Sequence, residues 1–215
     1  MTQANNQALI TFIKNPEKGK VKTRLAKTMG DDKALAIYKA LLQHTRNITL
    51  AVDCTRYLFY SQYINQEDDW STNDFQKLLQ VEGNLGYKMA TAFQIVFQKH
   101  QKVLIIGSDC ASLTTEIIAD SFKQLDHHDF VLGPAEDGGY YLLGMNSFQP
   151  SVFENIEWST ETVLQRTIEN IKRINASYTL LPTLSDIDYE EDWIKHGWDL
   201  EEKTPTRPTI SSKQV

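Results

Sequence analysis

The chain lacks three features that would place it in particular protein classes: frequent cysteines, a long apolar run and an excess of basic residues. Its two cysteines among 215 residues, Cys54 and Cys110, support neither a disulfide framework nor a cysteine-rich zinc site. No apolar run is long enough to span a bilayer, and the beginning, MTQANNQALITF, lacks the features of a signal peptide. We therefore expect a cytoplasmic protein with reduced thiols and no membrane span.

The charge balance and the composition narrow the class further. The net charge of −6 argues against nucleic acid as a partner. The 41% share of hydrophobic residues, beside 23% charged residues, is typical of a globular domain with a substantial core. We expect a single domain over residues 1–199 and a polar, proline-containing, loosely ordered tail over residues 200–215.

Short apolar runs alternate with segments of helical periodicity. Strands are predicted at residues 8–14, 56–60, 102–109, 129–135, 140–145 and 178–184, with a further candidate at 78–82. Helices are predicted at residues 33–48, 84–100, 114–126, 159–174 and 189–198. The run at 102–109 is almost entirely apolar, which indicates the centre of a sheet covered by helices. This order predicts an α/β fold, a three-layer sandwich with a mixed, mostly parallel sheet.

Two helix starts carry candidate capping side chains. Asp31 or Asp32 is expected to cap the first helix. Ser159 or Thr160 is expected to cap the helix at residues 159–174, although the acid of a full capping box is missing there.

A cluster of cations follows the first predicted strand. Six basic residues lie in this stretch against one acid, Glu17: Lys14, Lys18, Lys20, Lys22, Arg24 and Lys27. In an extended loop, alternation turns four of them the same way, namely Lys18, Lys20, Lys22 and Arg24. Gly19 lets backbone amides close on an anion. The spacing matches neither a Walker loop nor GxGxxG, so the pattern predicts another kind of phosphate loop, with a solvated lysine-rich loop as the alternative.

Asp109 follows the strand predicted for the centre of the sheet, within GSDCASL. Ligands of open α/β sheets bind beyond the carboxyl ends of the strands. A carboxylate at that place suits Mg²⁺ or Mn²⁺, which take oxygen ligands and bridge carboxylates to substrate phosphates. The alternative role of Asp109 is to cap the following helix. A nucleophilic role for Cys110 is disfavoured against a buried cysteine, since no histidine lies near it in the sequence.

Two further acidic stretches are candidates. GPAEDGGYYLLGM reads as a hairpin, with Glu136 and Asp137 beside the turn glycines Gly138 and Gly139.

In LSDIDYEED, Asp186 and Asp188 alternate and would share a face of an extended segment. Paired carboxylates can complete a metal site or act as a general base. A helix N-terminus, favoured by the helix dipole, is the alternative explanation and accounts well for the acids at positions 190–192.

The motifs KGKVKTRLA, GSDCASL, GPAEDGGYYLLGM, WST and DIDYEED occur in an order and spacing that resemble a glycosyltransferase-like family with a glycosyltransferase A-type fold. That family is related at the fold level to the molybdenum-cofactor and 2-phospholactate nucleotidylyltransferases. The resemblance runs from about Leu9 to about Trp193 and implies a nucleotide-diphospho-sugar transferase fold. Two departures are Ala111, where the family usually has proline, and Tyr189, where it usually has threonine.

The resemblance also implies roles for individual residues. The nucleotide would lie at the first loop, which contains Lys14 and Gly19, with Lys22 and Arg24 facing its phosphates. The residues implied on the metal side are Asp109 and Asp188, and the residue implied on the acceptor side is Asp137.

These features together predict a metal-dependent transferase. It would bind a nucleotide or nucleotide-sugar donor with Mg²⁺ or Mn²⁺ and move a glycosyl or nucleotidyl group to a small acceptor, which Asp137 would orient or deprotonate. Two alternatives stay open. One is a nucleotide-binding protein without turnover, and the other is a phosphatase that uses the DID of residues 186–188 as an aspartyl nucleophile.

Overall fold

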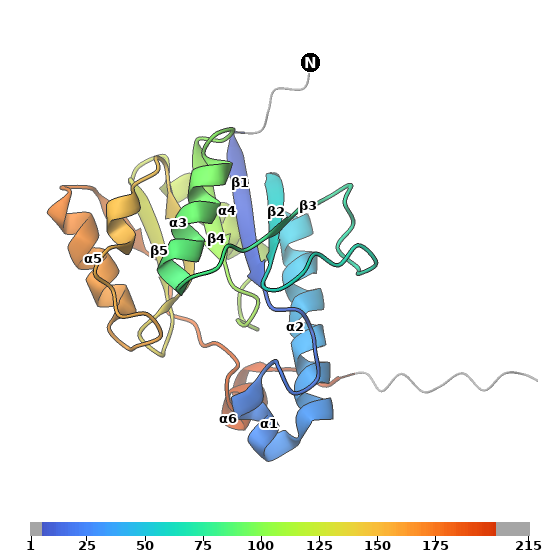
Figure 1. Ribbon diagram of the computed structural model, residues 1–215. Helices are drawn as coiled ribbons and strands as arrows, with labels where there is room; N and C mark the ends of the chain where they lie inside the picture. Colours follow the sequence, from blue (N-terminus) through green and yellow to red (C-terminus); the bar gives the residue numbers. More distant parts are fainter. Residues whose placement is uncertain (1–5, 201–215) are drawn as a thin grey trace, which may run out of the picture.

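A computed structural model describes residues 6–200, which form a seven-stranded sheet between layers of helices (Figure 1). The strand order is β3-β2-β1-β4-β6-β5-β7. The strands are β1 (Gln7–Ile13), β2 (Thr55–Tyr60), β3 (Gln76–Leu79), β4 (Lys102–Ile106), β5 (Phe130–Pro134), β6 (Tyr140–Met145) and β7 (Tyr178–Leu180). Only β6 runs antiparallel to its neighbours, β4 and β5, among these strands. The predicted α/β class with a mixed, mostly parallel sheet is confirmed.

The helices cover both faces of this sheet. They are α1 (Thr23–Met29), α2 (Asp31–Leu50), α3 (Leu85–Val96), α4 (Thr115–Gln124), α5 (Val163–Arg173) and α6 (Glu190–His196), with a short 3₁₀ helix at Pro150–Phe153. Phe93 of α3 and Ile171 of α5 pack with Ile105 of β4 on one face. Phe122 of α4 packs with Leu104 on the other face. Because β4 is buried on both sides, the prediction of a central strand at this position is confirmed.

The helix starts depart from the capping predictions at two places. Gly30 precedes α2 with φ 81°, and no side chain caps that helix, so Asp31 and Asp32 lie inside its first turn. Helix α5 begins only after Thr162, since the Leu164 amide donates to the Gly138 carbonyl (2.9 Å) and this contact with the hairpin fixes where the helix starts. The predicted caps at positions 159 and 160 therefore lie in the preceding loop.

The connections at the carboxyl ends of β1 and β4 position the site. Figure 1 shows α1 and α6 side by side beyond that edge of the sheet. Between residues 6 and 200, no helix combines the length and apolar character needed to cross a membrane. Apart from Leu200, the predicted polar tail falls outside the described residues.

Candidate functional site

A cleft of about 600 Å³ opens beyond the carboxyl ends of the central strands. It is lined by the loop after β1, the residues after β4, the hairpin turn, the loop before α5 and the segment before α6. The predicted site residues that line it are Lys14, Lys22, Arg24, Asp109, Asp137 and Asp188. Gly19 does not line it, although its φ of 75° shows the left-handed backbone that favours glycine.

The loop after β1 is not extended as far as the sequence predicted. Helix α1 already begins at Thr23, so the four cations do not alternate along one extended segment. Lys18 pairs with Asp32 (2.6 Å) and does not line the cleft, whereas Lys20 lines it while pairing with Glu17 (2.5 Å). The prediction that all four cations face the same way is therefore wrong, because a short helix follows the loop.

Lys22 occupies a strained and buried position at the start of α1. Its φ of 48° lies in the left-handed region, which costs a non-glycine residue on the order of 1–3 kcal/mol. Only 4% of its side chain is exposed. Strain of this kind persists where the surrounding structure holds a residue in place, and it is frequent at functional sites.

The buried ammonium lies between two carboxylates. Lys22 Nζ is 2.8 Å from Asp109 Oδ1 and 3.6 Å from Asp188 Oδ1. Within the described part of the chain Nζ makes these ion pairs but no well-aligned hydrogen bond, so it keeps N–H groups for another acceptor. The predicted phosphate-binding cation thus contacts both of the predicted metal-side carboxylates.

Arg24 forms the outer part of the same cluster. Its guanidinium Nη1 donates to Asp188 Oδ2 (2.9 Å) and its Cζ lies 5.7 Å from the centre of the Tyr189 ring. Asp192 Oδ2 accepts from the backbone amides of Asp188 (2.9 Å) and Tyr189 (2.7 Å). Tyr189, the residue that departs from the family motif, therefore packs its ring against Arg24.

Asp109 is fixed by a backbone hydrogen bond, and its side chain does not cap α4. The Ile187 amide donates to the Asp109 carbonyl (2.9 Å), which joins the residues after β4 to the segment before α6. The side chain of Thr114, not Asp109, caps α4 by accepting from the Ile117 amide (3.3 Å). The Asp109 carboxylate is left facing the cleft and Lys22.

Asp186 also lines the cleft, and its carboxyl group has an unusual environment. Its pKa is raised to about 7, chiefly by burial and also by the nearby carboxylates of Asp109, Asp137 and Asp188, against the opposing effect of Lys22. A carboxyl with a pKa near neutrality can give or take a proton at physiological pH.

The hairpin between β5 and β6 presents Asp137 to the cleft. Asp137 Oδ1 accepts from the Gly139 amide (2.9 Å), which fixes the side chain over the turn. Gly138 has φ 86°, and a Cβ atom there would lie 2.1 Å from the Glu161 carbonyl oxygen. The other acid of the hairpin, Glu136, does not line the cleft and lies 4.0 Å from Lys195.

The position of Lys14 depends on Tyr38, which the sequence predicted only as part of a helix. Tyr38 of α2 accepts from the Lys14 amide (2.8 Å) and donates to its carbonyl (3.0 Å). Burial raises the pKa of Tyr38, so the hydroxyl stays neutral and keeps its proton for this bond. The spacing of apolar residues identified the helix but carried no signal for this contact.

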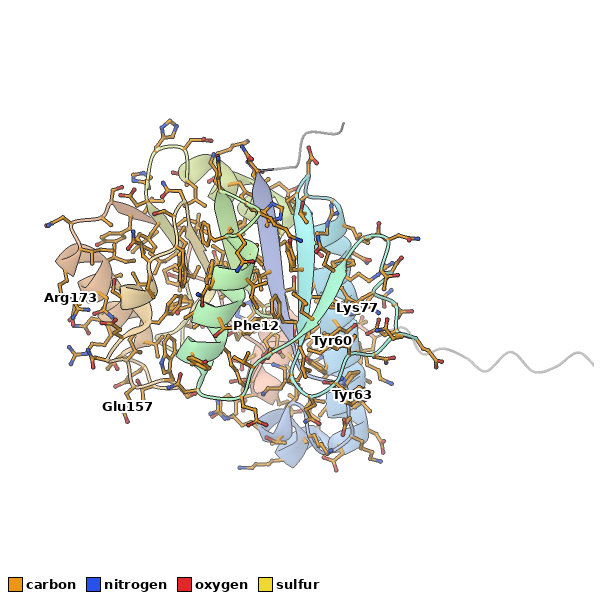
Figure 2. The ribbon with its side chains drawn as sticks, turned by 45° about the horizontal axis from the view of Figure 1, so that its top comes forward. Phe12, Tyr60, Tyr63, Lys77, Glu157 and Arg173 are labelled. Carbon is orange, nitrogen blue, oxygen red and sulfur yellow. The ribbon has the colours of Figure 1, made fainter. Side chains whose placement is uncertain are left out.

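A polar network at the β2–β3 edge supports the first loop. The buried Asn15 side chain donates to the Tyr63 carbonyl (2.9 Å) and accepts from the Gln62 amide (3.1 Å). Nearby, Lys77 donates to Asp68 (2.7 Å), which also accepts from the Tyr60 hydroxyl. Figure 2 shows Tyr60, Tyr63 and Lys77 gathered at this edge of the sheet.

Two aromatic residues of the cleft were missed. Trp158 and Tyr140 line it beside Leu85, at the start of α3. Gly86 makes room for Trp158, since a Cβ atom on Gly86 would lie 2.3 Å from the indole ring. The sequence features that could have pointed to this aromatic surface were the WST motif and the two glycines of EGNLG.

Cys110 is buried, as expected for a structural cysteine. The pKa of its thiol is raised to about 12, chiefly by burial and also by the charge of Asp186. A thiol with this pKa is a poor nucleophile near neutral pH.

The donor set around Lys22 fits a divalent cation that shares its ligands with a bound phosphate. Within residues 6–200, no group of three or more His, Cys, Asp and Glu side chains is arranged to hold a metal ion. Asp109 and Asp188, however, both contact one ammonium, so their oxygens already converge on a single positive charge. Two carboxylates completed by phosphate oxygens are a typical environment for Mg²⁺.

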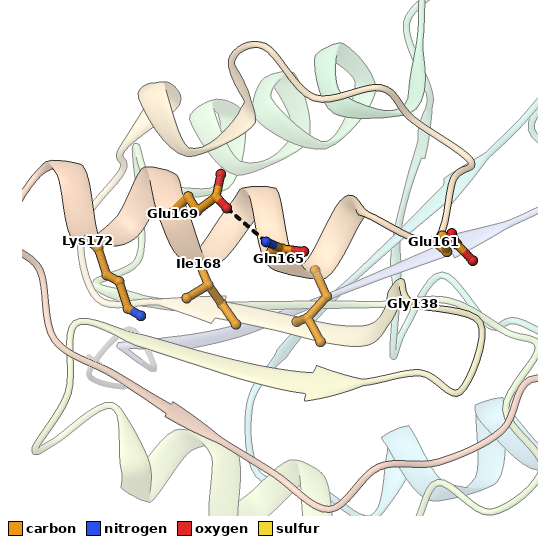
Figure 3. A pocket seen from close by; sticks show the side chains of 7 residues that line it. Gly138, Glu161, Gln165, Ile168, Glu169 and Lys172 are labelled. Atoms are coloured by element: carbon orange, nitrogen blue, oxygen red, sulfur yellow. Dashed lines mark hydrogen bonds between the residues drawn. The ribbon is translucent and has the colours of Figure 1, made fainter.

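A second cavity, of about 340 Å³, runs along α5 (Figure 3). Figure 3 shows Ile168 and Lys172 pointing from this helix toward the neighbouring strands, with the Gln165–Glu169 hydrogen bond (3.1 Å) on its outer side. Its lining contains one cation, Lys172, and two acids, Glu161 and Glu169, but no residue of the carboxylate–lysine cluster. The chemistry of the molecule is therefore concentrated in the larger cleft.

Comparisons with known proteins place these features in context. Residues 44–160 match the sequence model of a family described as "Uncharacterized protein conserved in bacteria (DUF2064)". No curated protein matches the chain. The chain is similar to a "putative nucleotide-diphospho-sugar transferase" from Desulfovibrio desulfuricans, with 31% sequence identity, a TM-score of 0.80, and coverage of 86% of this chain and 83% of that one.

Two more distant structures share the fold. One is 4-diphosphocytidyl-2C-methyl-D-erythritol synthase from Anaerococcus prevotii, with 9% identity, a TM-score of 0.59, and coverage of 90% of this chain and 95% of that one. The other is Rv0371c from Mycobacterium tuberculosis in complex with manganese, with 11% identity, a TM-score of 0.52, and coverage of 90% and 98%. The predicted nucleotide-diphospho-sugar transferase type of fold is thereby confirmed.

Proposed function

Since this chain belongs to the bacterial DUF2064 family, we propose that it is a transferase that binds the phosphates of a nucleotide or nucleotide-sugar donor in the cleft. The group transferred to a small acceptor would be glycosyl or nucleotidyl. The fold that the chain shares with nucleotide-diphospho-sugar transferases and nucleotidyltransferases supports this proposal.

One observation carries the proposal: two cations from the first loop and α1 meet two carboxylates from distant parts of the chain. Lys22 and Arg24 pair with Asp109 and Asp188 inside one cleft, although Arg24 and Asp188 are 164 positions apart. The Arg24–Asp188 pair is half-exposed, and an ion pair kept only for stability gains little at such a site. A cluster of both signs at the carboxyl ends of the strands is suited to bind phosphates and a cation together.

The charge of each residue determines its proposed role. Lys22 and Arg24 would supply fixed positive charge to the donor phosphates, where negative charge grows as the leaving group departs. A Mg²⁺ or Mn²⁺ ion held by Asp109 and Asp188 would add positive charge against the phosphate oxygens. Asp137, which lines the cleft from the hairpin turn, would orient the acceptor and accept its proton.

Donor binding is tested with a thermal-shift panel of nucleoside diphosphates, nucleoside triphosphates and nucleotide-sugars, with and without Mg²⁺ or Mn²⁺. A ligand at about a hundred times its Kd stabilises a protein by roughly 2.7 kcal/mol, which such a scan detects. We expect a metal-enhanced shift. Absence of a shift with every donor would contradict the proposal.

Two variants on α1 distinguish a specific contact with the donor from nonspecific electrostatic attraction. Arg24→Gln should weaken binding of the best donor about tenfold, because charge-assisted hydrogen bonds contribute roughly 1.5–3 kcal/mol. Lys27→Gln removes the same charge from an exposed position of the same helix that does not line the cleft, and should change the affinity little. Equal losses in both variants would indicate nonspecific attraction.

Product analysis separates the remaining alternatives. Binding of a donor without product over long incubation with acceptors would favour a nucleotide-binding protein without turnover. Release of phosphate from a generic aryl phosphate, lost in Asp186→Asn or Asp188→Asn, would favour the phosphatase instead.

A further inference from the structure

Charge is unevenly distributed around the cleft. Its four basic lining residues all come from one short stretch of the chain: Lys14, Lys20, Lys22 and Arg24. Among the described lining residues from Leu85 onward none is basic, and the hairpin turn and the loop before α5 contribute two acids, Asp137 and Glu161. We call the wall formed by the start of α3, the hairpin turn and the loop before α5 the far wall, and it has no cation for a phosphate or carboxylate group. Its residues are Leu85, Asp137, Gly139, Tyr140, Trp158, Ser159, Thr160, Glu161 and Val163.

Apolar and aromatic side chains make up the rest of the far wall. Half-buried Trp158 lines it together with Leu85 and Tyr140. The indole ring is fixed from behind, since Gly86 leaves no side chain beneath it and the Phe153 ring lies 6.5 Å away between centroids. Tyr140 is held by the contact of its hydroxyl with Met89 Sδ (3.9 Å). A rigid surface of this kind suits the apolar face of a ring-shaped ligand.

Hydroxyl groups flank this aromatic surface. Ser159 lines the cleft in a left-handed conformation with φ 66°, which is strained for a non-glycine residue. Thr160 fixes the loop by donating to the Glu157 carbonyl (2.8 Å) and by its contact with the Thr162 hydroxyl (2.9 Å). The far wall thus combines an aromatic platform, hydroxyls and carboxylates, which is a set that hydrogen-bonds to a polyol.

We infer that the far wall is the acceptor subsite and that it takes an uncharged, ring-shaped polyol, with Trp158 against the ring. This inference rests on the proposed function. A phosphorylated acceptor would bring like charge beside Asp137 and Glu161, with no cation of the far wall to offset it. An acceptor hydroxyl is then the nucleophile, and the group transferred in this proposal is glycosyl.

The step balances as a displacement at the anomeric carbon of the donor sugar. The acceptor oxygen forms a bond to that carbon, while the bond from the carbon to the phosphate oxygen breaks. The nucleoside diphosphate leaves with the electron pair, next to Lys22 and Arg24. The proton of the acceptor hydroxyl passes to the carboxylate of Asp137.

The subsite is tested by saturation-transfer NMR with matched probes on the full chain. The neutral probes are the methyl glycosides of glucose, galactose and mannose together with myo-inositol, and the charged probes are the corresponding hexose phosphates and inositol 1-phosphate. We expect at least one neutral ring to bind and its phosphorylated counterpart to bind at least tenfold more weakly. A phosphorylated ring that binds the far wall more tightly than the neutral ring, or a lack of binding by every neutral ring, would overturn the inference.

Variants of the far wall locate the bound ring. Trp158→Ala should weaken binding at least tenfold, while Trp158→Phe should retain most of it. Tyr87→Ala removes a 60% exposed aromatic ring from the same part of α3 outside the cleft and should leave binding unchanged. If Trp158→Ala does not fold, the 43% exposed Leu85 gives a second variant, Leu85→Ala, with the same expectation of weaker binding. Unchanged binding in the folded variant would contradict a subsite at Trp158.

The donor titration separates this inference from the proposed function. A chain that binds a nucleotide-sugar but no neutral ring refutes the subsite and leaves the donor site standing. A chain that binds a neutral ring through Trp158 but no nucleotide refutes the proposed transferase while the far wall remains a polyol site.

Discussion

At the scale of single residues, Lys22 is the residue that connects the carboxylates of the site. Its backbone is strained, its side chain is buried, and its ammonium contacts two carboxylates from different segments. The sequence identified Lys22 as one of several similar cations, since a basic loop looks the same whichever lysine is buried. Only the fold separates Lys22 from Lys18, which pairs with Asp32 outside the cleft.

A pH-dependent prediction belongs to Asp186. Its pKa is raised to about 7, chiefly by burial, whereas an unfolded aspartate titrates near 3.9. The folded state therefore retains a proton that the unfolded state loses, and the stability from this group is present below about pH 4 and lost as the pH rises to about 7. Asp186→Asn removes this loss, so the variant should gain stability over the natural chain, on the order of a few kcal/mol at most, between pH 4 and pH 8.

Urea unfolding of both proteins at pH 4, 6 and 8 measures this difference. The free energy of unfolding of Asp186→Asn minus that of the natural chain should increase with pH. A difference that is constant across these pH values would show that Asp186 titrates normally in the fold.

At the scale of elements, the contact between the hairpin and α5 shapes the acceptor side. Gly138 lies against the backbone of Glu161, and its carbonyl accepts from the Leu164 amide. The sequence predicted the hairpin, because two apolar runs flank a glycine pair. It did not predict that the turn would set the start of α5, since this contact joins positions that no local pattern connects.

Gly138→Ala should be markedly more destabilising than Gly19→Ala. Both glycines have positive φ, 86° and 75°, so alanine is strained at either position. A Cβ at Gly138 would also lie 2.1 Å from the Glu161 carbonyl oxygen, whereas a Cβ at Gly19 has nothing nearer than the Asp31 carboxylate, at an ordinary contact distance of 3.8 Å. Chemical denaturation measures the free energy of unfolding of both variants. Equal losses of stability would mean that α5 can move away from the turn at little energetic cost.

Helices and strands were predicted correctly where burial determines the spacing of their apolar residues. The apolar run of β4 and the apolar stripe of α3 were placed from the sequence because each follows the geometry of its own element. Helix α1 was read as loop, since its seven residues, TRLAKTM, include Leu25 as their single buried residue. A helix this short depends on tertiary contacts, here with α2 and α6, that a local pattern does not contain.

At the scale of the whole molecule, the sheet brings the site together. Because β1 and β4 are parallel neighbours, Lys14 and Asp109 emerge at the same edge, and the segment before α6 crosses that edge with Asp186 and Asp188. The sequence predicted the class of the fold and most of the charged residues that line the cleft. It did not predict the strand order, in which β6 lies between β4 and β5, because strand pairing depends on contacts between distant segments.

Contacts between distant segments also explain why the apolar residues of the far wall were not predicted. Trp158 and Leu85 come from segments that are remote in sequence and meet only because Gly86 has no side chain. Charged clusters are visible in a sequence, whereas an apolar surface of a cleft is indistinguishable there from an apolar surface of the core.

Calorimetry tests most directly whether Asp109 and Lys22 belong to a site for a donor phosphate and a divalent cation. The donor with the largest thermal shift is titrated with and without Mn²⁺ into the natural chain and into Asp109→Asn, whose backbone contact to Ile187 is unaffected by the substitution. We predict that Mn²⁺ tightens donor binding at least tenfold in the natural chain and has no such effect in Asp109→Asn, while both proteins unfold at similar temperatures. Equal enhancement by Mn²⁺ in the two proteins would contradict the account.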